Sequence, residues 1–321
     1  MSLVTAESPS RLVKGAHKAP NPRTTSNRRR AILPLLLVVC GVLVLLYPVV
    51  ATYVTNRGQS VVSQYYTDEM NSQFTDEEIE QMISAANSYN DGIDGGPILD
   101  PWLARVREDN PAYTRYLEQL NLADAMGRVI IPSIRSDLPI YHGTTEDVLE
   151  KGIGHLFGTS LPVGGARTHA VLTGHTGLTK ATMWDNLRDV KAGDAIFVQV
   201  GKKKLKYQVH NTEVVAPGET KGLAPVVGED LLTLITCTPY GINSHRLLVH
   251  AHRVEYTPED NEIFSRPLSP WQEWMTWVVV FIALVLALVL AGTLTRRRAR
   301  RQTHELQHAS MERMHASMER M

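Results

Sequence analysis

The sequence predicts a mainly β domain flanked by two membrane-spanning helices. Residues 127–256 alternate short β-rich segments with breaks at Gly and Pro, a pattern typical of an all-β barrel or sandwich. One long apolar run precedes this region and another follows it, and each is long enough to cross a hydrocarbon core of roughly 30 Å. Besides these spans and their tails, the 321 residues leave room for one folded domain.

The composition argues against a nucleic-acid partner. The chain has 33 Lys and Arg against 33 Asp and Glu, so it carries no global basic field. Its hydrophobic content of 43% is ordinary for a globular protein. The two cysteines are Cys40, inside the first apolar run, and Cys237, in the β-rich region. We therefore expect Cys237 to have no disulfide partner in its own chain.

The apolar runs predict a two-pass membrane protein, with transmembrane helices at 31–54 and 274–295. Arginines precede the first span and follow the second, namely Arg28, Arg29 and Arg30, and Arg296, Arg297, Arg298, Arg300 and Arg301. Because Lys and Arg next to a span stay on the cytoplasmic side, we expect both termini in the cytoplasm. The β domain is then extracellular.

A cleaved signal peptide is the alternative for the first span. Its apolar core is longer than the roughly 7–15 residues of a signal peptide, and a basic tail precedes it, which favours an uncleaved anchor. Cleavage near Ala51 remains the alternative to an uncleaved anchor. The second span, with an aromatic belt of Trp271, Trp274 and Trp277 at its start, holds the chain in the membrane in either case.

The segment before the β domain is expected to be largely helical. Residues 1–30 lack a periodic apolar face and predict a disordered cytoplasmic tail. Residues 55–125 predict an extracellular helical region. Within it, apolar residues recur at helical spacing from 58 to 87, and a capping motif at Thr75 and Glu78 predicts a restart, so we expect two helices there.

A Gly-rich loop at 88–97 interrupts this helical pattern, and a further helix is expected at 111–122. Between them stands the triplet Asp100-Pro101-Trp102. Its local chemistry alone favours a helix N-cap with Pro at the first helical position.

Residues 126–258 predict the β domain itself. Seven strands are expected, at 129–131, 138–141, 170–173, 195–200, 205–215, 231–236 and 247–256. A short helix is expected at 181–187, and the run Lys202, Lys203 and Lys204 is expected at a solvated hairpin tip. A linker at 259–273 leads to the second span. The basic cytoplasmic tail at 296–321 contains two copies of a heptad, too few for a stable coiled coil.

Cys237 is the candidate nucleophile. It ends the apolar run 231–237 immediately before a turn at Pro239 and Gly241. The thiolate is the reactive form of cysteine and a free thiol has a pKa of about 8.5, so a base or cation is needed nearby.

His175 is the favoured partner among the eight histidines of the extracellular region. It follows the strand at 169–173 in a turn between Gly174 and Gly177, which predicts an exposed position at the rim of the domain. His250 and His252 alternate along one strand face, which favours solvent or a satisfied hydrogen-bond network. A lone cysteine with scattered histidines does not supply zinc-ligand spacing, so we expect no metal, and nothing indicates an organic cofactor.

Arg246 is the candidate for oxyanion stabilisation. If residues 238–245 form a loop between neighbouring antiparallel strands, Cys237 and Arg246 face the same cleft. The guanidinium keeps its charge and offers planar donors to a carbonyl oxygen. A surface salt bridge is the alternative for this arginine.

These segments together resemble the sortases, the membrane-anchored cysteine transpeptidases of Gram-positive bacteria. Thr233-Leu234-Ile235-Thr236-Cys237 fits the Thr-Leu-X-Thr-Cys pattern of that family, and residues 238–249 closely resemble its pilus-assembling branch, class C. Thr173-Gly174-His175 looks like the histidine motif of the family, and residues 154–160 resemble the segment before it. The similarity covers about residues 58–256.

The resemblance implies a closed β-barrel of about eight strands with added N-terminal helices. It implies Cys237 as the nucleophile, His175 as the proton-transfer partner and Arg246 as the stabiliser of oxyanion or substrate. It also makes Asp100, Pro101 and Trp102 a lid, in place of the helix cap. Asp100 is then expected to pair with Arg246, and Trp102 to cover Cys237.

The implied reaction is cleavage of an LPXTG-type C-terminal sorting signal between Thr and Gly. A thioacyl intermediate on Cys237 would pass to a lysine amine of an acceptor pilin, polymerising pili without a cofactor. Three alternatives stay open: a housekeeping sortase that attaches proteins to cell-wall peptidoglycan, a hydrolytic cysteine peptidase of the cell envelope, and a binding module with a structural cysteine. The protonation state of the Cys–His pair also stays open.

Overall fold

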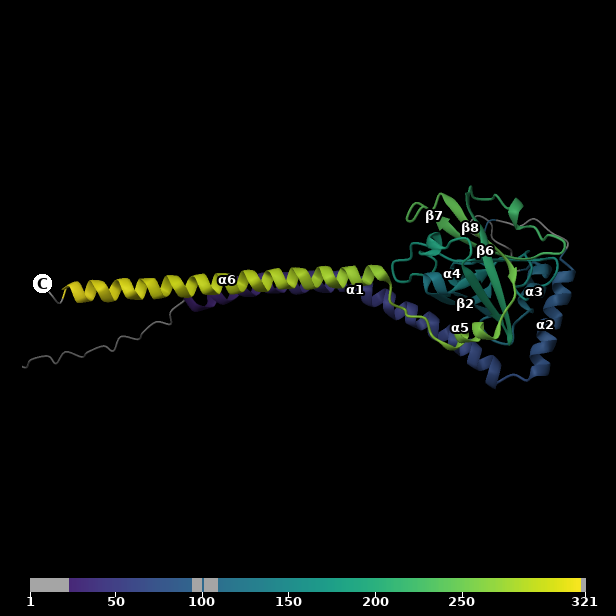
Figure 1. Cartoon of the computed structure of the whole chain (residues 1–321), viewed down its shortest axis with the longest axis horizontal. Coiled ribbons are helices and arrows are strands. Elements are labelled where there is room, and N and C mark those ends of the chain that lie inside the picture. Colours follow the sequence, from purple (N-terminus) through teal and green to yellow (C-terminus); the bar gives the residue numbers. More distant parts are fainter. Residues whose placement is uncertain (1–22, 94–99, 101–108, 319–321) are drawn as a thin grey trace, which may run out of the picture. The chain divides into compact units, whose positions relative to one another are not determined.

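The computed structural model of the chain describes residues 23–93, 100 and 109–318 (Figure 1). The chain divides into two compact units, Met1–Leu45 and Leu46–Met321. The first unit contains the beginning of helix α1 (Arg23–Ser72), and the second contains the rest of α1 and every other described element.

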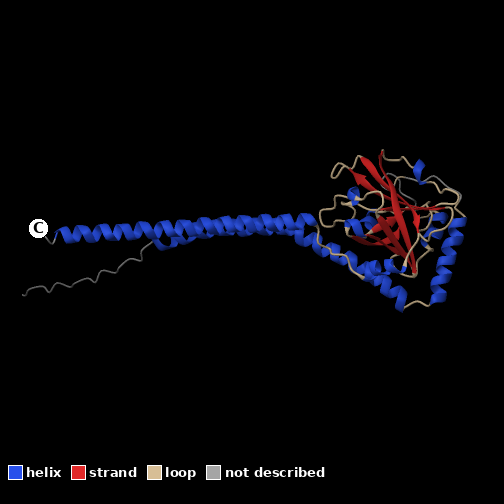
Figure 2. Ribbon diagram, viewed as in Figure 1, coloured by secondary structure: helices blue, strands red, loops and turns tan. Residues whose placement is uncertain are grey.

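The second unit is built on a closed barrel of eight strands, as the sequence and its family resemblance predicted (Figure 2). The strands run in the order β1-β2-β3-β4-β7-β8-β6-β5, and β5 closes the barrel on β1. Two neighbouring pairs are parallel, β2 with β3 and β4 with β7, and the others are antiparallel. Their bounds are β1 Gly127–Ile131, β2 Ser136–His142, β3 Ile153–His155, β4 Thr168–Thr173, β5 Ala195–Val200, β6 Lys203–Val215, β7 Asp230–Thr238 and β8 His245–Val254.

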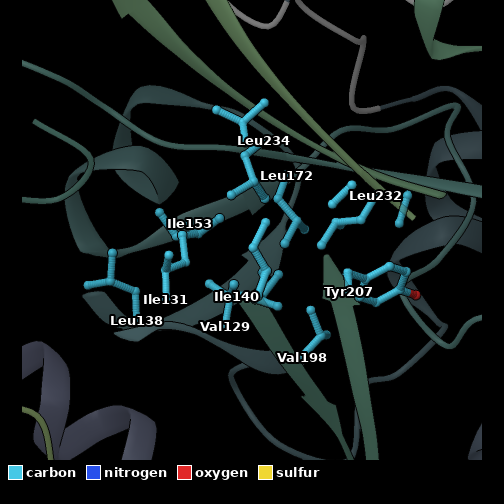
Figure 3. Close-up of a cluster of buried hydrophobic side chains, with 14 of the residues drawn as sticks. Val129, Ile131, Leu138, Ile140, Ile153, Leu172, Val198, Tyr207, Leu232 and Leu234 are labelled. Atoms are coloured by element: carbon cyan, nitrogen blue, oxygen red, sulfur yellow. The ribbon is translucent and has the colours of Figure 1, made fainter. Parts of the chain in front are cut away.

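The barrel interior is filled by aliphatic side chains from alternate strand positions (Figure 3). Val129 and Ile131 from β1 and Leu232 and Leu234 from β7 all belong to this core, and all four are fully buried. This period of two is what a strand with one inward face requires. Burying each such side chain contributes about 1.5–3 kcal/mol, so the core holds the strands that carry the candidate site.

Helices α2 (Asp76–Asp91) and α3 (Pro111–Leu117) lie beside the barrel (Figure 1). The predicted restart at Thr75 is confirmed, because its side chain accepts from the Glu78 amide at 3.2 Å and the Glu78 carboxylate accepts from the Thr75 amide at 2.8 Å. Buried Ala86 and Tyr116 join the main core. The shorter elements are α4 (Glu146–Lys151), α5 (Asn261–Ser265) and the 3-10 turns η1 (Pro132–Ile134), η2 (Leu187–Asp189), η3 (Lys221–Leu223) and η4 (Pro258–Asp260).

Three local predictions in the β domain need correction. Strand β3 was not predicted, because three residues around a glycine carry too little pattern. The helix expected at 181–187 is wrong: these residues form a turn that ends in η2, and Met183 has a left-handed φ of 41° that no α-helix contains. Lys203 and Lys204 begin β6, so only Lys202 lies at the hairpin turn.

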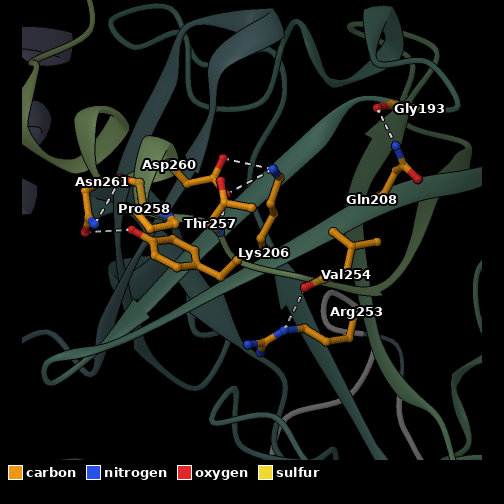
Figure 4. Close-up of polar contacts among 10 residues, drawn as sticks. Gly193, Lys206, Gln208, Arg253, Val254, Thr257, Pro258, Asp260 and Asn261 are labelled. Carbon is orange, nitrogen blue, oxygen red and sulfur yellow. Dashed lines mark hydrogen bonds and ion pairs between the residues drawn. The ribbon is translucent and has the colours of Figure 1, made fainter.

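The expected linker at 259–273 is partly structured and packs on the barrel. The Lys206 ammonium of β6 donates to both Asp260 carboxylate oxygens, at 2.8 and 3.0 Å, while Gln208 donates to the Gly193 carbonyl (Figure 4). Phe264 of α5 is buried, and its carbonyl accepts from the guanidinium of Arg128, which also pairs with Asp137. The chain therefore stays attached to the barrel as far as the second apolar helix.

Helices α1 and α6 (Glu273–Met318) contain the two predicted spans. Length and composition allow Leu33–Ser72 and Glu273–Met314 to cross a membrane, and 6% of each apolar window is buried, unlike the core helix of a soluble protein. Both helices extend past the predicted spans. Residues 23–30 belong to α1, and the predicted tail at 296–318 continues α6 because its repeat is rich in strong helix formers such as Ala, Met, Glu and Arg.

Candidate active site

Cys237 and Arg246 lie opposite each other on neighbouring strands. β7 and β8 pair antiparallel, and their register aligns Cys237 with Arg246. Directly opposed residues of an antiparallel pair project from the same face of the sheet. The guanidinium and the thiol therefore project from one face of the sheet. This was expected if residues 238–245 form a loop between two adjacent antiparallel strands.

The parallel pairing of β4 with β7 brings His175 to the same edge of the barrel. Thr173, two residues before His175, is aligned with Ile235, two residues before Cys237. Two hydrogen bonds continue the pairing past the end of β4. The Gly174 amide donates to the Ile235 carbonyl at 3.1 Å, and the Thr236 hydroxyl donates to the Gly174 carbonyl at 2.8 Å.

His175 is more enclosed than its turn predicted. Its side chain is only 12% exposed, and its Nε2 lies 3.2 Å from Oε1 of Glu146 in the first turn of α4. On the other side of the residue, the Trp184 amide donates to the His175 carbonyl at 3.1 Å. Glu146 was not among the predicted site residues, because an acid in the first turn of a helix is ordinary and carries no signal of a site.

Arg246 is bound by a carboxylate from a distant part of the chain. Its Nε donates to Asp100 Oδ2 at 2.9 Å and its Nη2 donates to Asp100 Oδ1 at 3.2 Å, with the two side chains 7% and 5% exposed. Its Nη1 donates to the carbonyls of Asn243 and His245. This two-pronged geometry is the strong form of an ion pair. The pairing expected from the two charges is therefore present, whereas Pro101 and Trp102 lie outside the described residues.

The surroundings of Cys237 favour its protonated form. Burial raises the pKa of the thiol, the Arg246 guanidinium lowers this pKa, and the Asp100 carboxylate raises it. Asp100 thus offsets the effect of the Arg246 guanidinium, a positive charge that would stabilise a thiolate. With Asp100 in place, the site holds its candidate nucleophile in the less reactive state.

A narrow recess beside this ion pair has apolar walls. It is lined by Leu156, Leu223, Ile235 and Leu248, with Asp100 and Arg246 at its charged end. The loop between β6 and β7 forms its rim at residues 218–220. Apolar side chains thus lie beside the guanidinium and its carboxylate partner.

The other histidines of the domain have structural partners. His155 is completely buried between the Tyr116 hydroxyl, 3.0 Å from its Nδ1, and the Ser160 carbonyl, 2.8 Å from its Nε2. His250 bridges Thr233 and Glu213 at 2.9 and 3.1 Å, which is the satisfied network expected for it. Within the described ranges no group of three or more His, Cys, Asp or Glu gathers as metal ligands would.

Known proteins resemble this domain in both fold and sequence. The sortase domain family matches residues 129–254. Sortase C-1 from Actinomyces oris is 54% identical over 56% of this chain and 99% of its own, with a TM-score of 0.55. Sortase C from Streptococcus pneumoniae, whose structure is described in terms of catalysis and pilin substrate specificity, is 40% identical over 60% of this chain and 95% of its own, with a TM-score of 0.54. The match to sortase D from Bacillus subtilis (strain 168) is 29% identical over 40% of this chain and spans 64% of that protein.

Proposed function

Because the chain belongs to the sortase family of cysteine transpeptidases, we propose that it cleaves an LPXTG-type C-terminal sorting signal between Thr and Gly and joins the threonyl carbonyl to a lysine amine of a pilin. The observation that carries this proposal is the alignment of Cys237 with Arg246 on paired strands, with His175 two residues past the end of β4, the strand that pairs with β7 on its other side. Pilin as substrate is supported by the likeness to sortase C of Streptococcus pneumoniae.

In the proposed reaction, the Cys237 thiolate attacks the Thr carbonyl while Arg246 donates to the developing oxyanion. The protonated His175 gives its proton to the departing Gly amine, so the bond between Thr and Gly breaks and a thioester forms. A lysine amine then attacks this thioester, His175 accepts the proton of the amine, and an isopeptide bond replaces the thioester. The thioester conserves the energy of the cleaved peptide bond, so the transfer to lysine needs no further energy-supplying reactant.

Asp100 occupies the position that the reacting carbonyl needs. Its carboxylate binds the donors of Arg246, so substrate must displace it before the guanidinium can act. We therefore assign Asp100 to a lid, together with Pro101 and Trp102 of the same triplet. Alanine substitution of Asp100 or of Trp102 should change turnover of a short sorting peptide, and unchanged turnover and thiol labelling in both variants would remove the lid from the proposal.

The catalytic assignment is tested with Cys237→Ala, His175→Ala and Arg246→Ala in the full chain. Each substitution should abolish joining of a sorting peptide to a lysine-bearing pilin, while Cys40→Ala should leave it intact. Mass spectrometry of the product distinguishes the alternatives: an isopeptide cross-link supports a pilin polymerase, transfer to a peptidoglycan amine alone supports a housekeeping enzyme, and hydrolysis alone supports a peptidase. Full activity of Cys237→Ala would contradict the mechanism.

Membrane anchoring by the two apolar helices is the proposed setting for this reaction. The arginines outside each span support an arrangement with both termini in the cytoplasm and the barrel on the outer face, where sorting signals are presented.

A further inference from the structure

The loop that follows His175 returns to the histidine from which it starts. We call residues 174–187 the histidine loop. The Trp184 amide donates to the His175 carbonyl at 3.1 Å, and the Asp185 carboxylate accepts from the Gly177 amide at 2.7 Å. The Trp184 indole also packs under Gly174, where an added Cβ would lie 2.7 Å from the ring. The backbone position of His175 therefore depends on where Trp184 is held.

Residues next to both apolar helices hold this loop from its other side. Asn56, on α1, accepts from the Thr182 amide at 3.1 Å and donates to the Thr182 hydroxyl at 2.9 Å and to the Pro270 carbonyl at 3.2 Å. Asn186 of the loop donates to buried Gln272, just before α6, at 2.8 Å. The loop is thus joined to the N-terminal apolar helix through Asn56 and to the start of the C-terminal one through Gln272.

The backbone between these contacts is strained. Met183 has a φ of 41°, in the left-handed region that costs a non-glycine residue roughly 1–2 kcal/mol. Its sulfur accepts from buried Gln59, also on α1, at 3.0 Å. A strained conformation persists only where its surroundings determine it, and here those surroundings are α1 on one side and the core residue Trp184 on the other. Without the α1 contacts the loop has a lower-energy backbone available.

We propose that Asn56 and Gln272 are positioning residues for His175, which they set through the strained histidine loop. The two juxtamembrane segments then form part of the catalytic apparatus as well as connecting it to the membrane helices. This inference rests on the proposed role of His175. Neither residue touches the reacting atoms, so each acts through Thr182 or Asn186.

The test compares Asn56→Ala and Gln272→Ala with Gln64→Ala in the full chain in detergent micelles. Gln64 is a matched control because it lies on the same helix and is partly buried, and among the described residues its side chain donates to Ser60 of that helix. With a sorting-motif peptide, kcat should fall about 10- to 100-fold in Asn56→Ala while KM changes much less, since a displacement of about 1 Å in a catalytic group has effects of this size. Asn56→Asp keeps the acceptor for the Thr182 amide and should recover part of the loss.

Two further measurements separate positioning from general instability. Hydrogen exchange should accelerate at residues 176–187 in Asn56→Ala but not in β1, and the pH profile of Cys237 alkylation should shift. A kcat equal to that of Gln64→Ala, or unchanged exchange in the loop, would overturn the proposal. If Asn56→Ala loosens the whole barrel, the proposal is judged on Gln272→Ala instead, by its kcat relative to Gln64→Ala and by hydrogen exchange in the histidine loop. Full activity of His175→Ala would instead refute the catalytic role, which distinguishes the two failures.

Discussion

Among single side chains, the ion pair between Asp100 and Arg246 adds to burial in setting the protonation of Cys237. A buried thiol needs a nearby positive charge to ionise, and the guanidinium that could provide it is bound on two of its nitrogens by a carboxylate. Burial and Asp100 both raise the pKa of Cys237, against the lowering effect of Arg246. Removing Asp100 should therefore activate the thiol as well as open the site.

We expect the substitution Asp100→Asn to make the Cys237 thiol more reactive. With Cys40→Ala in the background, alkylation of Cys237 should have a lower pH midpoint and a several-fold higher rate at pH 7, because the uncompensated Arg246 stabilises the thiolate. The measurement is the rate of iodoacetamide labelling across pH. A faster rate with an unchanged midpoint would mean that Asp100 only blocks access, and an unchanged rate and midpoint would contradict its influence altogether.

At the level of strands and loops, the local sequence pattern predicted the features that are set by residues close together in the chain. Short β-rich segments bounded by Gly and Pro identified seven of the eight strands, and the expected loop after Cys237 correctly predicted the alignment with Arg246. The parallel pairing of β4 with β7 could not be derived in this way, since it joins segments about sixty residues apart. The turn at Met183 was also hidden, because contacts from α1, over a hundred residues earlier, impose its backbone.

The pairing of β4 with β7 predicts a specific role for Thr236. Its hydroxyl donates to the Gly174 carbonyl and is almost completely buried. Thr236→Val keeps the shape but loses the hydrogen bond, so the free energy of unfolding should fall by about 1 kcal/mol. The turn of His175 would also shift, and kcat should fall about tenfold or more. Exposed Thr212→Val on β6 is the matched control, and equal kcat values in the two variants would contradict this role.

For the domain as a whole, two buried neutral histidines predict acid sensitivity. Burial lowers the pKa of His155 and of His169 to about 4, against about 6.5 in an unfolded chain. Between about pH 6.5 and 4 the unfolded state binds more protons than the folded state. The stability that the two neutral histidines contribute is therefore fully present above pH 6.5 and is lost as the pH falls toward 4. From pH 7.5 to 5.5 the two together should lower the free energy of unfolding by about 3 kcal/mol. In His155→Gln, the free energy of unfolding measured with denaturant should change less steeply with pH than in the wild-type chain. An equally steep pH dependence would contradict a buried neutral His155.

The proposed placement of the whole chain across the membrane rests on where its charges and apolar helices lie. If both helices span, and the arginines at 28–30 and 296–301 stay in the cytoplasm, the barrel and Cys237 face the outside. In a background of Cys40→Ala and Cys237→Ala, the exposed positions Lys191 and Ser310 can each carry a single reporter cysteine. A membrane-impermeant thiol reagent should label Lys191→Cys in intact cells and Ser310→Cys only after lysis. Labelling of both in intact cells would mean that the second helix does not return the chain to the cytoplasm, and labelling of neither would place the barrel inside, where sorting signals on the outer face could not reach it.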